Sequence, residues 1–152
     1  MHSTNFRESS LIVTFFSLDF GLIKLVAKGA KLKNSKFSNI KVPGATFKIE
    51  FGGRSELKNL YTCESIGSII IKESNFKIYL YLNELILKTL ELEAPMKLIF
   101  NDLINLFKEL ETVKDPLEKE LKLRRFEYGL ICLLYTSPSP RDATLSRMPS
   151  SA

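Results

Sequence analysis

The first half of the chain alternates short apolar runs with turn residues, a pattern typical of β-strands. The alternation is most regular in "TFKIEF", residues 46–51, where Phe47, Ile49 and Phe51 share one face. We expect the phenylalanines on that face to pack in a core. Strands are expected at residues 10–16, 22–28, 46–51, 56–64 and 68–72. Short strands joined by close turns predict a small β-barrel.

After the last expected strand, the spacing of apolar residues changes to that of helices. The first helical stretch is apolar on nearly all sides, which is typical of a buried helix. The second carries an apolar stripe from Met96 to Val113. Asp115, Pro116 and Glu118 have the order of a capping box with proline in the first turn, which predicts the start of a third helix. The expected helices lie near residues 75–92, 95–113 and 116–134.

The two patterns predict an α+β protein with a barrel-like domain at residues 1–73 and a helical domain at residues 74–134. Residues 135–152 follow neither pattern, because they hold three prolines and five serines without an apolar period. The third helix also runs into them without a stop signal. We expect a disordered tail there that is not native to the protein and makes few contacts. A natural disordered tail is the alternative.

Composition argues against several classes of function. No apolar run approaches the ~20 residues that a membrane-spanning helix requires. Cys63 and Cys132 are too far apart for a zinc site or a disulfide framework, which favours a cytoplasmic setting, and Cys63 is expected to be a small core residue. The single histidine, His2, leaves no nucleophile–histidine pair, and no glycine-rich phosphate loop is present. We therefore expect no catalysis, no metal site and no cofactor.

The net charge of +5 is unevenly distributed along the chain. Residues 1–80 carry twelve Lys and Arg against six Asp and Glu, whereas residues 81–130 carry eight against ten, so the balances are +6 and −2. The interval from Lys24 to Lys48 contains no acidic residue. Because like charges repel one another and do not help a domain to fold, this interval predicts a polyanionic partner. A loop that is merely solvated is the alternative.

The basic interval favours binding of a nucleic acid. Phosphates supply the counter-charge that clustered lysines lack, and exposed aromatic rings give bases a surface on which to stack. Phe37 lies inside the basic interval and is the aromatic residue that we most expect to be exposed. Arg54 and Lys58, from the neighbouring hairpin, are expected to extend the basic path. The candidate DNA-binding residues are Lys24, Lys28, Lys31, Lys33, Lys36, Phe37, Arg54 and Lys58.

Four segments resemble the bacterial RecO family of recombination mediators, in that family's order and at its spacing. They are "RESSLIVTFFSLDFGLIKLVAKGAK", "FGGRSELKNLYTCE", "YLNELILKTLELE" and "LRRFEYGLICLL", and the resemblance covers nearly all of residues 2–134. It implies an N-terminal OB-fold followed by a helical domain. It also implies a protein that binds single- and double-stranded DNA, anneals complementary strands, associates with RecR and helps to load RecA onto DNA covered by single-strand-binding protein.

The chain departs from the family pattern at both ends. Family members have a first strand before the segment that matches His2 and Ser3, so we expect that strand to be missing here. The C-terminal part, which carries a four-cysteine zinc site in some relatives, is also expected to be missing, so the helical domain is expected to be truncated. An open barrel edge and an uncovered apolar helical surface would follow.

Three functions remain open on the sequence. The first is a DNA-binding, strand-annealing repair mediator without catalysis, located in the cytoplasm with the nucleoid. The second is an OB-fold module that binds RNA, and the third is a protein-interaction scaffold whose basic loop meets an acidic partner. Three long apolar helices favour the first over a simple RNA-binding module.

Overall fold

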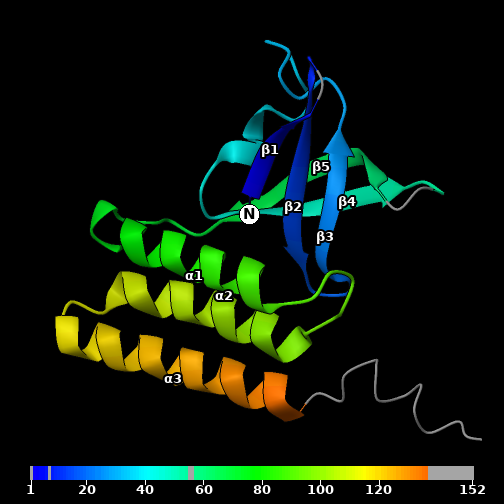
Figure 1. Cartoon of the computed structure of the whole chain (residues 1–152). Coiled ribbons are helices and arrows are strands. Elements are labelled where there is room, and N and C mark those ends of the chain that lie inside the picture. The colour runs from blue at the N-terminus through cyan, green and yellow to red at the C-terminus, as the bar shows by residue number, and fades with distance from the viewer. Residues whose placement is uncertain (1, 7, 55–56, 137–152) are drawn as a thin grey trace, which may run out of the picture.

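The computed structural model describes residues 2–6, 8–54 and 57–136, which form a five-stranded sheet followed by three helices (Figure 1). The strands are β1 (His2–Phe6), β2 (Ser10–Ser17), β3 (Gly21–Ala27), β4 (Ala45–Gly52) and β5 (Lys58–Ser68). Two short 3-10 helices, η1 (Ser38–Lys41) and η2 (Glu73–Asn75), lie in the connections. The long helices are α1 (Phe76–Thr89), α2 (Lys97–Thr112) and α3 (Pro116–Thr136). The chain is therefore an α+β protein, as the sequence predicts.

The strand order is β1-β2-β3-β5-β4, and β3 pairs with β5 in parallel while all other pairs are antiparallel. Figure 1 shows the β4–β5 hairpin crossing β2 and β3 at a steep angle, so the sheet is strongly curved. Five strands in this order, with β1–β3 as a meander, are consistent with the partly open barrel of an OB-fold. No ladder joins β1 to β4 among the described residues.

One core lies inside the curved sheet. The alternation expected for residues 46–51 is confirmed, because Phe47, Ile49 and Phe51 all pack against this core while Lys48 and Glu50 are exposed. The buried members of the core come from β2, β3, β5 and the connection after β3: Leu11, Val13, Phe15, Ile23, Leu25, Ala27, Phe37, Ile40 and Leu60.

A second core joins the helices to the sheet. The stripe expected on α2 is confirmed, since Ile99, Leu103, Leu106 and Leu110 are buried in it. Leu22 at the start of β3 is buried in the same core, which places that end of the sheet directly on the helices. The sheet and the helices therefore contribute apolar side chains to a common core, and they are not joined only by a linker.

Three expectations about elements need correction. The first strand is present as β1, and it pairs with β2 from His2 opposite Thr14 to Phe6 opposite Ser10. The expected strands at residues 56–64 and 68–72 are one strand, β5, and residues 69–72 are not strand. The pairing with β4 explains the length of β5 and its end. β4 pairs with β5 as far as Ser68, and beyond that residue the turn at Gly44 leaves β5 without a partner strand.

The expectation for the first helix is also wrong in one respect. α1 is not buried on all sides, because its buried residues are Leu82 and Ile86, while Leu80 and Tyr81 are exposed. Tyr81 lies outside the apolar core and instead donates a hydrogen bond of 2.6 Å from its hydroxyl to Glu127 of α3. The bounds of all three helices otherwise lie within three residues of the prediction.

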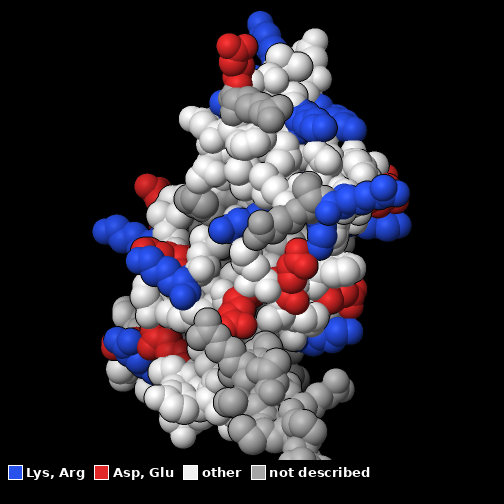
Figure 2. Space-filling view, turned by 45° about the vertical axis from the view of Figure 1, so that its right-hand side comes forward, with Lys and Arg blue, Asp and Glu red and all other residues white. Residues whose placement is uncertain are grey.

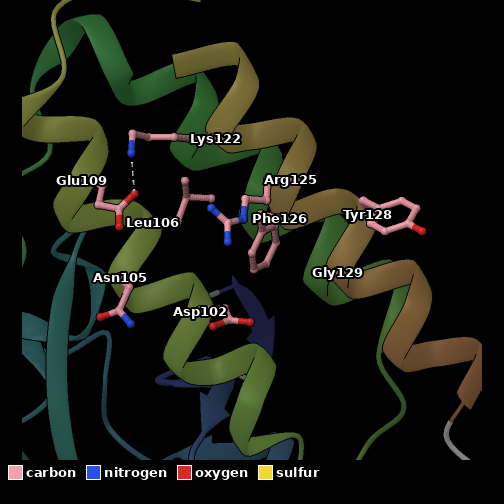
Figure 3. Close-up of a pocket in the computed structure, with 9 residues that line it drawn as sticks. All are labelled: Asp102, Asn105, Leu106, Glu109, Lys122, Arg125, Phe126, Tyr128 and Gly129. Atoms are coloured by element: carbon pink, nitrogen blue, oxygen red, sulfur yellow. Dashed lines mark hydrogen bonds and ion pairs between the residues drawn. The ribbon is translucent and has the colours of Figure 1, made fainter. Parts of the chain in front are cut away.

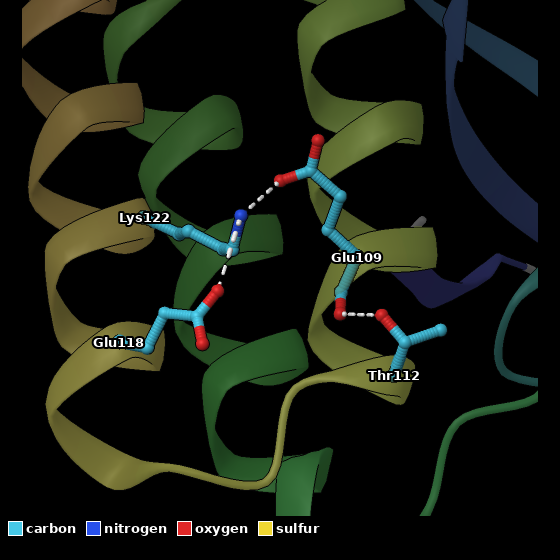
Figure 4. A network of polar contacts seen from close by, with 4 residues as sticks. All are labelled: Glu109, Thr112, Glu118 and Lys122. Atoms are coloured by element: carbon cyan, nitrogen blue, oxygen red, sulfur yellow. Dashed lines mark hydrogen bonds and ion pairs between the residues drawn. The ribbon is translucent and has the colours of Figure 1, made fainter.

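The start of α3 follows the predicted signal. The side chain of Asp115 accepts a hydrogen bond of 3.2 Å from the backbone N–H of Leu117, and Pro116 is the first helical residue. Glu118 contributes instead to a polar network in which Lys122 contacts Glu109 of α2 at 3.0 Å and Glu118 at 3.7 Å (Figure 4). The tail expected at residues 135–152 differs at its start, because Tyr135 and Thr136 belong to α3. Residues 137–152 lie outside the described residues.

Asn75 joins all of the helical elements at one buried point. Its side chain is only 3% exposed, and its Nδ2 donates at 2.9 Å both to the carbonyl of Leu110 and to the carboxylate of Glu111. Its Oδ1 accepts a hydrogen bond of 2.6 Å from Lys119 of α3. The Leu110 carbonyl is one of those that the last turn of a helix leaves unpaired, so Asn75 satisfies the end of α2.

Asn75→Leu is expected to lower the free energy of unfolding by about 2–3 kcal/mol, because it leaves the buried Leu110 carbonyl without its partner and releases Lys119. Chemical denaturation followed by circular dichroism measures the change. Asn101→Leu, the same substitution at an exposed position of α2, is the control and should change stability by less than about 0.5 kcal/mol. Equal effects of the two substitutions would contradict the role given to Asn75.

Candidate nucleic-acid interface

The one basic residue of β3, Lys24, lies on the outer face of the sheet. Lys24 is exposed, while Leu25 beside it is completely buried in the barrel core. Lys24 lies opposite Thr14 of β2, and Lys28, four residues further on, follows the end of the strand and is also exposed. Side chains alternate between the faces of a strand, so Lys24 and Lys28 lie on the same face, about 13 Å apart. Glu8 lines the same shallow pocket as Lys28, so one acidic residue adjoins this path.

The segment after Lys28 is a folded series of turns rather than an extended loop. Successive backbone hydrogen bonds run from Leu32 to Gly29, from Ser35 to Leu32 and from Ser38 to Ser35. The N–H of Lys31 donates to the carbonyl of Ser9 at 3.1 Å, which ties the segment to the β1–β2 turn. Lys31, Lys33 and Lys36 are all exposed on this framework. Figure 1 shows that the segment starts at the end of β3 remote from the helices.

Phe37 is not the exposed ring that the sequence led us to expect. Its side chain is 3% exposed and belongs to the barrel core, and Ile40 of η1 is buried beside it in the same core. The turns before Phe37 fold the segment back over the barrel, so that Phe37 and Ile40 join the core while Leu32 remains exposed. Because the ring of Phe37 is buried, it cannot stack on a base, and we remove it from the candidate site.

Lys36 connects the segment of turns that starts at Lys28, here called the basic segment (residues 28–41), to the β4–β5 hairpin. Its Nζ donates a 2.7 Å hydrogen bond to the carbonyl oxygen of Tyr61 on β5, and it lies 5.0 Å from the centre of the Phe37 ring. The ammonium group therefore keeps two donors for other partners, because a lysine carries three. This contact brings the basic segment and β5, which are 25 residues apart in sequence, to one surface.

The two predicted residues of the hairpin differ from each other. Arg54 is exposed in the β4–β5 connection. Lys58, at the start of β5, is partly buried, forms a 2.7 Å ion pair with Glu93 and lies 6.0 Å from the centre of the Phe51 ring. A phosphate at Lys58 would have to compete with Glu93, so Lys58 is the weakest of the basic candidates.

The charges of the sheet and of the helices are organised differently. Within the part of the chain that the structure describes, Lys24, Lys28 and Lys33 form no ion pair, whereas most ion pairs lie within the three helices, as around Lys122 in Figure 4. Figure 2 shows basic side chains gathered on the upper part of the molecule, which the sheet forms, and both signs mixed over the helices. The sheet thus carries positive charge that is not neutralised internally.

Sequence reasoning missed two aromatic side chains near this surface. Tyr61 is 50% exposed and Phe20, in the β2–β3 turn, is 51% exposed. The Phe20 ring contacts Phe51 edge to face, with ring centres 5.1 Å apart. The sequence carries no clear signal for Tyr61, because the pairing of β4 with β5 shifts at this residue. The position of Phe20 depends on a turn geometry that the sequence does not specify.

Two further pockets lie away from the candidate DNA-binding lysines. One of about 500 Å³ lies between α2 and α3, where Asp102 and Glu109 offset Lys122 and Arg125 and so leave little net charge for a phosphate (Figure 3). Another, of about 630 Å³, lies between the sheet and the helices and is lined mostly by apolar and aromatic side chains. Neither pocket has the positive lining that a phosphate requires.

The described residues provide neither a metal-binding cluster nor a reactive cysteine at Cys63. No group of three His, Cys, Asp or Glu side chains there could hold a metal ion. Cys63 packs partly against the barrel core as expected, and burial raises the pKa of its thiol to about 11, so it is protonated and unreactive at neutral pH. Among the described helices, none is long and apolar enough to cross a membrane.

The sequence is similar to those of proteins named recombination protein O or RecO. A family model described as "Recombination protein O N terminal" matches residues 1–69. The DNA repair protein RecO of Enterobacter sp. (strain 638) is 35% identical over 133 residues, which cover 86% of this chain and 55% of that relative. The corresponding protein of Aliivibrio salmonicida (strain LFI1238) is 32% identical over 136 residues, covering 88% of this chain and 56% of the relative.

The RecO protein of Escherichia coli (strain K12) is 35% identical over 133 residues, covering 86% of this chain and 54% of the relative. The chain thus spans about half the length of the curated relatives that it matches. The family model covers the sheet, and the relatives extend the match through most of the helices. The N-terminal part of the chain thus matches the family of recombination protein O, and the sequences of both parts are similar to those of RecO proteins.

Proposed function

We propose that this protein binds the phosphates of single-stranded DNA through its basic surface, without catalysing a reaction. The basic surface consists of Lys24, Lys28, Lys31, Lys33, Lys36, Arg54 and Lys58. One observation carries the proposal: in the connection after β3, Phe37 and Ile40 are buried in the barrel core, whereas the lysines of the connection are exposed to solvent. A partner rich in phosphates would supply the missing counter-charge.

The proposed process is DNA repair. The relatives are named DNA repair proteins, and the role is carried from them to this chain as part of the proposal. In it the protein acts in the cytoplasm as a recombination mediator, anneals complementary strands and assists the loading of RecA together with RecR on DNA covered by single-strand-binding protein. Annealing requires contact with the backbone and not with particular bases, and exposed lysines provide contacts of that kind.

Single-stranded DNA fits this surface better than a folded acidic protein does. A flexible strand can follow lysines distributed over β3, the next connection and the β4–β5 hairpin, whereas a rigid partner needs matching positions. The curved sheet of an OB-fold is suited to such a strand. Arg54 lies in the connection between β4 and β5, one of the two that OB-folds use around their ligands.

The first test is binding of the full chain to fluorescent single-stranded oligonucleotides of two unrelated sequences at several salt concentrations. We expect similar affinities for the two sequences, and a logarithm of the binding constant that falls linearly with the logarithm of salt, with a slope of about −0.7 for each phosphate contacted. Fluorescence anisotropy measures both quantities.

RNA of the same sequences and an acidic peptide of equal charge serve as competitors. Preferential displacement of DNA by the RNA would favour the RNA-binding alternative, and preferential displacement by the peptide would favour the scaffold. The absence of DNA binding at low salt by a folded chain would refute the proposed function.

A further inference from the structure

Tyr61 leaves the regular pairing of its strand at a β-bulge. Glu50 of β4 pairs with Thr62, and the next residue, Phe51, pairs with Leu60, so Tyr61 has no opposite residue. A bulge turns the side chain of the extra residue away from the regular pattern of the strand. The result is a tyrosine whose side chain is half exposed at the end of a hairpin whose core-facing residues are apolar.

The ring of Tyr61 rests on a glycine. A Cβ atom placed on Gly52 would lie 3.1 Å from Cε2 and 3.3 Å from the hydroxyl oxygen of Tyr61, which is closer than ordinary contacts. A larger residue at this position would require the ring to move slightly away from β4. The ring of Tyr61 thus lies close against the backbone of β4 at Gly52.

Two cations are connected to this part of the hairpin. The ammonium group of Lys36 is anchored on the carbonyl oxygen of Tyr61 itself, and Arg54 follows Gly52 by two residues. Further along the hairpin acidic residues accompany the basic ones, because Lys48 lies opposite Glu64 and Glu50 is its neighbour on β4. Tyr61 therefore lies where the uncompensated positive charge meets the hairpin.

From this arrangement we propose that the ring of Tyr61 stacks on a base of single-stranded DNA while Lys36 and Arg54 contact the adjoining phosphates. The inference rests on the proposed function and adds the position at which a base is held. An aromatic ring stacks on any base, so this position adds affinity without sequence preference. Tyr61 would thus provide the stacking surface that was expected of Phe37, whose ring is buried in the core.

The chain contains no tryptophan, so Tyr61→Trp creates a single fluorescent reporter at the proposed position. We expect strong quenching of its emission when single-stranded oligonucleotide is added, because stacked bases quench an indole directly. Tyr135→Trp, at an exposed position of α3, is the control and should be quenched little at the same saturation. Circular dichroism establishes that both variants are folded.

Affinity gives a second measurement. Tyr61→Leu removes the aromatic face and is expected to weaken binding about tenfold or more, whereas Tyr61→Phe should bind like the original chain. The salt slope should be unchanged in all variants, since no charge is altered. If the original chain binds DNA but Tyr61→Trp is not quenched and Tyr61→Leu binds normally, stacking is refuted while the proposed function stands. If the folded chain binds no DNA, both proposals fail.

Discussion

Gly21→Ala is expected to lower the free energy of unfolding by about 3 kcal/mol or more, a large share of the ~5–15 kcal/mol that stabilises a typical domain. Gly21 begins β3 with a φ angle of 66°, in the left-handed region that favours glycine. A Cβ atom there would overlap the carbonyl oxygen of Ala94 and lie 2.6 Å from its carbonyl carbon. Because the obstacle is backbone, no side-chain rotation can relieve it.

The contact with Ala94 belongs to the attachment between the sheet and the helices. In the connection from α1 to α2, Glu93 has a φ angle of 57° and donates its N–H to the carbonyl of Leu22 at 2.8 Å. The side chain of Glu93 also forms the ion pair with Lys58. Displacing this connection would therefore strain several contacts together, which is why the expected cost exceeds that of the left-handed φ alone.

Gly29→Ala is the matched control. Gly29 has a similar φ of 72°, but a Cβ atom there would meet only a side-chain carbon of Leu32 at 3.4 Å. Its substitution should cost about 1 kcal/mol, the penalty of the backbone angle without the overlap. Denaturant unfolding of the two variants measures the difference. Equal costs for both would show that the approach of Gly21 to Ala94 does not hold the sheet against the helices.

The elements that could be predicted from the sequence are those that depend on neighbours in the chain. The alternation of Phe47, Ile49 and Phe51, the cap at Asp115 and the stripe on α2 are local patterns, and the structure has all three. That residues 58–68 form the single strand β5 could not be predicted from local patterns, because the strand continues only as far as β4 pairs with it.

The candidate site was predictable in its charges but not in its rings. Exposed lysines follow from composition, since a lysine is almost never fully buried without a partner. The burial of Phe37 depends on turns that fold its segment over the barrel, and the exposure of Tyr61 depends on a bulge. The pairing of Lys58 with Glu93 joins residues 35 apart in sequence, so neither pattern nor spacing could indicate it.

The connection between sheet and helices also bears on the proposed function. Lys58 belongs to the basic surface and at the same time contacts Glu93 beside the backbone that Gly21 touches. Phosphate binding at Lys58 would weaken that ion pair, whereas binding at Lys28 or Lys33 would leave it intact. Variants for testing DNA binding are therefore best placed at the latter two positions, where loss of charge does not disturb the attachment of the helices.

The proposed binding of DNA phosphates is tested most directly by the salt dependence of DNA binding when Lys28 and Lys33 are both replaced by alanine. Both side chains are exposed, so the double variant should unfold at nearly the same denaturant concentration as the original chain. If each lysine neutralises one phosphate, the slope should fall in magnitude by about 0.7 for each substitution and by about 1.4 for the two. Affinity at 50 mM salt should then fall on the order of 50-fold.

Lys108→Ala, at an exposed position of α2, removes the same charge from the helical part and is the control. The measurement is a titration of fluorescent single-stranded oligonucleotide by anisotropy at several salt concentrations, with the fold of each variant verified by circular dichroism. We expect a reduced slope for the double variant and an unchanged slope for Lys108→Ala. An unchanged slope in a folded double variant would contradict the proposed binding, because the basic segment would then lie outside the path of the DNA.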